Sequence, residues 1–173
     1  MTTTTIDDQI AEVCRRVDRL QAHAQAGTQR TRRHLAALRE EEAAVRAAAR
    51  QAPDEVEEKL GRLRTRLDVA EHSLEADGAE DWEAFAAAVE AELQCWDAYL
   101  ERLQTGVAAK AWKAREQAEA AIGDVRDRGI ALGERLAEAR NPAGAARNEA
   151  RKHITASRDE LEQKATELST KLN

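Results

Sequence analysis

The chain has 173 residues, of which 35% are charged and 3% aromatic, and its formal net charge at pH 7 is −6. This composition excludes a thick aromatic core and disfavours β-sheets; it is typical of thin seams between helices whose outer faces carry Glu–Arg pairs. The negative charge is concentrated in residues 54–92, which hold 13 Asp and Glu against 4 Lys and Arg. An acidic balance argues against nucleic acid as the main partner.

Residues 6–51 are predicted to form the first helix, with Thr5 as its N-cap. Four apolar residues spaced three and four apart predict a coiled-coil seam at its start: Ile10, Val13, Val17 and Leu20. Further along the same register, residues such as Gly27 and His34 occupy seam positions. The N-terminal quarter is therefore the strong part of the seam.

Residues 54–77 predict a second helix, which begins after Pro53. Its apolar positions keep the four-three spacing throughout: Val56, Leu60, Leu63, Leu67, Ala70 and Leu74. Gly78 follows, and glycine can take the left-handed conformation that ends a helix. We therefore expect a tight antiparallel turn at Gly78.

Residues 79–140 predict one very long helix around which the other segments pack. No proline interrupts it, one apolar stripe follows its whole length, and at 1.5 Å per residue it would be roughly 90 Å long. Residues 104–106 are its weakest point, because they read Gln-Thr-Gly and both Thr and Gly disfavour helix interiors. A break there would fold the long element in two.

Residues 142–172 predict a last helix, with Asn141 as N-cap and Pro142 in the first position. A hairpin with the long helix is favoured over a kinked continuation, because the apolar residues of this segment need a partner. The predicted fold class is all-α: an elongated antiparallel helical bundle or coiled coil built around one very long helix. The four helices, at about 6–51, 54–77, 79–140 and 142–172, are expected to form a single domain over residues 1–173.

The first predicted helix is much longer than the second, so its seam of Ile10, Val13, Val17 and Leu20 should overhang. Leaving a large aliphatic side chain in water costs about 1.5–3 kcal/mol. We therefore expect a second chain to cover the seam, which predicts a homo-oligomer, with a dimer favoured, or a complex with another helical protein.

Trp112 is a further candidate interface anchor. It lies about 160° around the helix from Trp96, and hence off the main seam. Interface hot spots are rich in tryptophan. The alternative is that the first or last helix of the same chain covers Trp112.

No catalytic or metal-binding pattern occurs in the sequence, so we expect no enzyme activity and no cofactor. The histidines are scattered over three helices: His23, His34, His72 and His153. Glu149 and His153 could share a metal with another chain, but a surface ion pair is the favoured interpretation. Cys14 and Cys95 have no short spacing, which argues against a disulfide framework and a zinc site.

Three further patterns have structural and functional interpretations. The glycines at 123, 129 and 133 lack the strand-turn-helix setting of a phosphate loop, and favour close helix approach or local flexibility. Cys95 is interpreted as a packed thiol beside Trp96. The basic run Arg30, Arg32, Arg33 and Arg39 could meet anionic lipid or phosphate, but the glutamates that follow favour ion pairs within the helix or with the acidic region 54–92.

The sequence thus predicts a non-catalytic coiled-coil scaffold or adaptor that acts through protein–protein association. The alternative is an amphipathic coat protein on a lipid or polymer granule surface, which the narrow, alanine-filled stripes disfavour. A chain that is disordered until it is dried or bound fits the high charge but not the regular heptads. No segment resembles a leader or a membrane span, and a cytoplasmic protein is expected.

Overall fold

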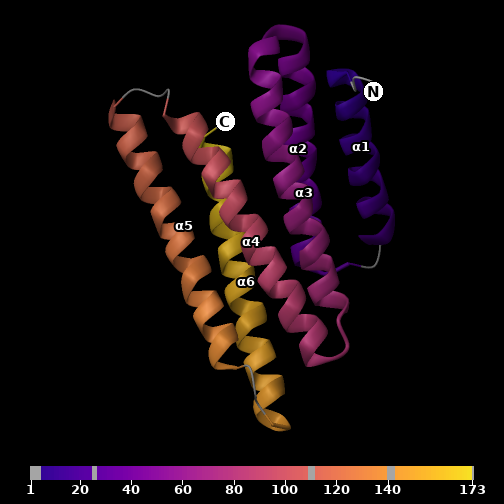
Figure 1. Ribbon diagram of the computed structural model, residues 1–173, viewed down its shortest axis with the longest axis vertical. Coiled ribbons are helices and arrows are strands. Elements are labelled where there is room, and N and C mark those ends of the chain that lie inside the picture. The colour runs from indigo at the N-terminus through magenta and orange to yellow at the C-terminus, as the bar shows by residue number, and fades with distance from the viewer. Residues whose placement is uncertain (1–4, 25–26, 109–111, 140–142, 173) are drawn as a thin grey trace.

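A computed structural model describes residues 5–24, 27–108, 112–139 and 143–172. Over these residues the chain is all-helical, which confirms the predicted class (Figure 1). The α-helices are α1 Ile6–His23, α2 Gln29–Gln51, α3 Val56–Gly78, α4 Trp82–Val107, α5 Trp112–Glu138 and α6 Ala145–Leu172, with one 3-10 turn, η2 Pro53–Glu55.

The hairpin of α3 and α4 is the centre of the bundle. Helices α1 and α2 pack on α3, whereas α5 and α6 pack together and against α4, so that α1 and α5 lie at opposite edges (Figure 1). One hydrophobic cluster lies among α1, α2 and α3 and includes Val17, Leu38 and Leu67. A second cluster runs from α3 to α6 and includes Trp96 and Ile122.

The prediction of one very long helix over 79–140 is wrong. Helix α4 ends at Val107, close to the predicted weak point, and α5 begins at Trp112 and runs back along α4 and α6. Folding back buries Ile122 and Val125 of α5 between α4 and α6, whereas a single extended helix would offer them only the last helix. The predicted apolar stripe therefore keeps its register, but it is covered by the chain itself.

The first predicted helix is also broken, and the predicted overhang is absent. Helix α1 ends at His23, and α2 starts after Thr28, whose side-chain oxygen accepts a hydrogen bond from the Thr31 amide at 3.3 Å. Because of this break, α1 packs against α2 and α3. Its seam is part of the chain's own core: Val13, Val17 and Leu20 are buried, and Ile10 packs against the same cluster.

The predicted hairpins are present. Asp81 caps α4 by accepting a hydrogen bond from the Ala84 amide at 2.7 Å, so the turn after α3 falls where we expected it. Gly78 does not have a positive φ, however, and Gly144 (φ 52°) is the one described glycine that does. The predicted N-cap Asn141 and the first helical residue Pro142 lie outside the described residues.

Candidate functional site

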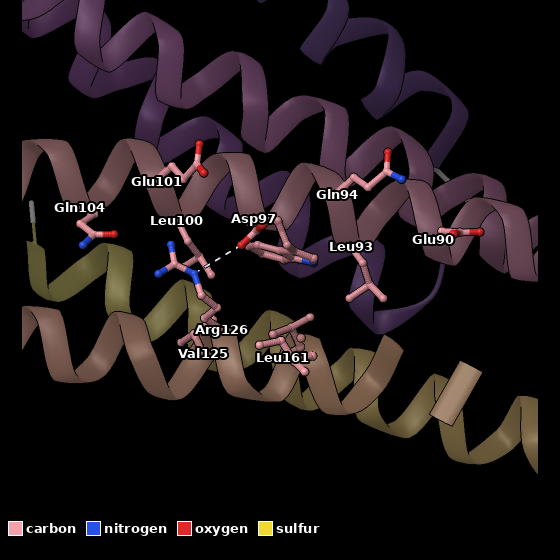
Figure 2. Close-up of a pocket in the computed structure, with 13 residues that line it drawn as sticks. Glu90, Leu93, Gln94, Asp97, Leu100, Glu101, Gln104, Val125, Arg126 and Leu161 are labelled. Carbon is pink, nitrogen blue, oxygen red and sulfur yellow. Dashed lines mark hydrogen bonds and ion pairs between the residues drawn. The ribbon is translucent and has the colours of Figure 1, made fainter. Parts of the chain in front are cut away.

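A groove of about 600 Å³ lies between α4 and α5, with α6 behind it (Figure 2). Its floor and walls are largely apolar: Leu93, Trp96, Leu100, Val125, Gly129, Ile130 and Leu161. Its polar lining residues are Glu90, Gln94, Asp97, Glu101 and Gln104 of α4 and Arg126 of α5. The volume falls within the range of about 300–1,000 Å³ that ligand pockets occupy.

The polar edge follows from the periodicity of α4. Its five polar lining residues recur at alternating steps of four and three, which places them on one stripe beside the buried stripe of the same helix. Between Glu90 and Gln104 that edge extends about 21 Å at 1.5 Å per residue. The groove therefore follows the helix that forms its wall over about four turns.

Gly129 keeps the α5 wall open. A Cβ atom at Gly129 would meet nothing within 4 Å, and the same holds for Gly123, which does not line the groove. At Gly133 a Cβ would lie 3.8 Å from Cδ1 of Leu93, an ordinary contact. The predicted close helix approach is thus not found at 123 or 129.

The edge of the groove is acidic. Glu90, Asp97 and Glu101 contribute three carboxylates, against the single guanidinium of Arg126. Arg126 Nε lies 3.4 Å from Asp97 Oδ1, and Figure 2 shows this pair spanning the two walls. An exposed ion pair of this kind contributes about 0.2–1 kcal/mol. The remaining negative charge favours a cationic ligand.

Beneath the groove, Trp96 adjoins a set of buried and half-buried ion pairs that we call the buried charge layer. The layer joins α6 to α2, α3 and α4, and consists of Arg30, Arg33, Arg66, Asp77, Glu92, Arg158, Asp159 and Glu162. Arg66 Cζ stands 4.3 Å from the centroid of the Trp96 ring, in cation–π geometry. Trp96 thus connects the groove floor to the charge layer.

Arg158 makes the most extensive set of bonds in the layer. Its Nε donates to Glu92 Oε2 at 2.7 Å, its Nη1 to Asp77 Oδ1 at 3.0 Å, and its Nη2 to the Ser73 carbonyl and hydroxyl at 3.1 Å. Arg158 is 1% exposed and Glu92 2%. Arg158 and Glu92 are thus shielded from solvent, and their bonds fix the orientation of α6 relative to α3 and α4.

His34, beside the layer, and Glu92, within it, have shifted pKa values. Burial lowers the pKa of His34 well below 6.5, and the charges of Arg66 and Arg30 lower it further. His34 is therefore a neutral ring, with its centroid 6.3 Å from that of Trp96. Burial also raises the pKa of Glu92, although the charge of Arg158 opposes this shift.

The residues proposed from sequence for association do not lie together. The seam of Ile10, Val13, Val17 and Leu20 faces α2 and α3, in the cluster that excludes α5. Trp112, at the start of α5, is 79% exposed, so neither α1 nor α6 covers it. The groove was not predicted from the sequence, although two signals for it were present: Gly129 and the polar stripe of α4.

The candidate chemical groups are also dispersed. No cluster of three or more possible metal ligands occurs among the described residues. Glu149 and His153 form the expected surface pair at 4.0 Å. Burial raises the pKa of the half-buried Cys95 thiol to about 11, which fits a packed thiol. Arg30 pairs with Asp77 of the acidic region, as expected, whereas the pairing of Arg33 with Glu162 of α6 was not foreseen.

No protein-family model, curated protein or solved structure matches this chain. None of the described helices is both long and apolar enough to cross a membrane.

Proposed function

We propose that the protein is a non-catalytic helical scaffold or adaptor that binds a partner protein through the groove between α4 and α5. The observation that carries this proposal is the groove itself, an apolar trough beside Ile130, which is 56% exposed. Covering a large aliphatic side chain stabilises a complex by about 1.5–3 kcal/mol. The buried charge layer supports the proposal, because it ties the α6 floor to the rest of the bundle.

Self-association is a second mode within this proposal. Because Val13, Val17 and Leu20 are buried against α2 and α3, a homodimer built on this seam requires that two copies exchange α1. Exchange of a terminal element through a short connection is a common route to dimers. We also place the protein in the cytoplasm, since Cys14 and Cys95 are both free thiols.

The groove is tested with Nile red, an uncharged apolar dye, and two matched variants of α5. Gly129→Leu places a side chain in the groove, whereas Gly123→Leu adds the same side chain outside it. We expect dye fluorescence to rise with the wild type and with Gly123→Leu, and dye affinity to fall at least about fivefold in Gly129→Leu. Equal dye binding by all three proteins would remove the groove as a binding site.

The coat-protein hypothesis is a second candidate, and the exposure of Trp112 favours it. Lys113 and Arg115 follow this side chain at the start of α5, and a tryptophan beside cations suits a lipid interface. We expect vesicles containing phosphatidylserine to shift the emission of Trp112 to shorter wavelength if this mode operates. Trp82 and Trp96 are buried, so Trp112→Phe should abolish the shift. If the emission of the wild type does not shift, the coat-protein hypothesis is excluded and the adaptor proposal remains.

A further inference from the structure

We infer that the groove between α4 and α5 takes an amphipathic helix of a partner protein, with an apolar ridge flanked by lysine or arginine. This inference rests on the proposed function and specifies its ligand. It is carried by the shape of the groove, by the secondary structure of its walls and by the charge of its edge.

The walls of the groove favour a helical ligand. An extended peptide binds well where it can pair with a free strand edge, and the described residues form no strand. A helix satisfies its own backbone hydrogen bonds. With side chains at i, i+3 or i+4, and i+7, it can place an apolar ridge against Leu93 and Ile130, as in other helix-in-groove complexes. A docked helix would complete a four-helix arrangement with α4, α5 and α6.

The spacing of the edge carboxylates favours cations at helical spacing. Glu90, Asp97 and Glu101 lie seven and four residues apart on one stripe of α4, which corresponds to about 10 and 6 Å along the axis. Among the described residues, Glu90 and Glu101 form no ion pair, whereas Asp97 pairs with Arg126. Lysines seven and four residues apart on an aligned helix would therefore face carboxylates along the groove.

The probe is a labelled synthetic helix of about 18 residues, or five turns, with a leucine ridge and flanking lysines. A second peptide replaces each lysine by glutamate. Binding to the intact protein is measured by fluorescence anisotropy at low and at physiological salt. We expect the lysine peptide to bind at least about tenfold more tightly than the glutamate peptide, and to lose affinity as salt rises.

Two pairs of matched variants locate the peptide. Gly129→Leu should weaken binding of the lysine peptide at least about fivefold, whereas Gly123→Leu should leave it unchanged. The double variant Glu90→Gln/Glu101→Gln should weaken it about fivefold and reduce its salt dependence. Glu12→Gln/Glu57→Gln makes the same change of net charge at exposed positions on α1 and α3, and should have no effect. Thermal melts of each variant check that it is folded.

Different outcomes would overturn the proposed ligand and the proposed function of the groove. If Nile red binds the groove but both peptides bind equally, or Glu90→Gln/Glu101→Gln has no effect, the basic helix is overturned and the adaptor stands. If Gly129→Leu affects neither dye nor peptide, both proposals fall. If light scattering shows a dimer that Gly129→Leu converts to a monomer, a second copy occupies the groove and the inference about a partner protein is overturned.

Discussion

Arg158 is a buried charged residue whose side chain links α6 to two other helices. One guanidinium on α6 holds Glu92 of α4 and both Ser73 and Asp77 of α3. Such a group is favourable only while all its partners are present, because a buried charge without a counterion is strongly destabilising.

Replacing Arg158 by methionine should therefore lower the free energy of unfolding by about 3–5 kcal/mol, since Glu92 loses its counterion and Asp77 keeps only Arg30. The measurement is urea denaturation followed by circular dichroism. The double variant Arg158→Met/Glu92→Leu should recover part of the loss, because it removes a buried charge that would otherwise be unpaired. Arg128→Met, which breaks pairs with the exposed Asp124 and Glu160, should cost less than about 1 kcal/mol. Equal losses in the two single variants would contradict this account.

His34 should make stability depend on pH. Because its pKa is lower in the folded than in the unfolded chain, only the unfolded chain gains a proton as pH falls below 6.5. Stability is therefore lost on acidification, by up to about 1.4 kcal/mol per pH unit. In His34→Leu this contribution is absent. The unfolding free energy of the variant minus that of the wild type should therefore increase from pH 7 to pH 5.

The carboxyl groups of Glu41 and Glu92 contribute to stability with the opposite sign. Burial raises the pKa of both, so the stability they contribute is present below their unfolded pKa and is lost as pH rises through the folded pKa. This contribution is common to wild type and His34→Leu and cancels in their difference. A difference that stays constant between pH 7 and pH 5 would show that His34 takes up its proton over the same pH range in the folded and unfolded chains, and would contradict the lowered pKa.

At the scale of elements, replacing a glycine by alanine should change stability in opposite directions inside a helix and in a connection between helices. Gly129 lies inside α5 with open space around it, so Gly129→Ala should stabilise the protein by about 0.5–1 kcal/mol through helix propensity. Gly27 lies in the connection from α1 to α2, where a Cβ would come within 2.8 Å of the Ala24 carbonyl oxygen. Gly27→Ala should therefore lower the melting temperature. The two melts, measured under identical conditions, should move in opposite directions.

At the scale of the whole molecule, the proposed exchange of α1 between two copies can be tested by its dependence on concentration and on the length of the connection. If dimers form by exchange of α1, light scattering coupled to size exclusion should show a dimer whose fraction rises with concentration. Inserting four Gly-Ser residues after Gly27 should shift the population to monomer, because a longer connection lets α1 reach its own core without strain. The same insertion after Gly144, between α5 and α6, is the control. A dimer that persists after the first insertion would exclude exchange of α1.

Some features of this protein follow from the sequence alone, because they depend on neighbours in the chain. The seam of α3, the N-cap of α1 at Thr5 and the burial of Trp96 all follow from spacing and local hydrogen bonding. The helical class itself follows from the same periodicities. Even the apolar stripe of α5 was located correctly, since a break in the helix does not change the register of the residues beyond it.

Only the tertiary structure decided where the long segments end and fold back. Helix propensities around residues 24–28 and 104–108 differ by at most about 1 kcal/mol per residue, so local preference does not choose between one long helix and two shorter ones. The choice depends on which surface covers Val17 and Ile122, and burying each is worth about 1.5–3 kcal/mol. The chain covers both by folding back on itself.

The buried charge layer and the groove were likewise decided by packing. By spacing, Arg158, Glu92 and Glu162 look like solvated residues on helix surfaces, and their burial depends on partners from helices far apart in the chain. The groove exists because α5 returns beside α4 and brings Gly129 opposite a polar stripe. A sequence determines which faces of its helices are apolar, but which faces meet depends on the free energy of the whole arrangement.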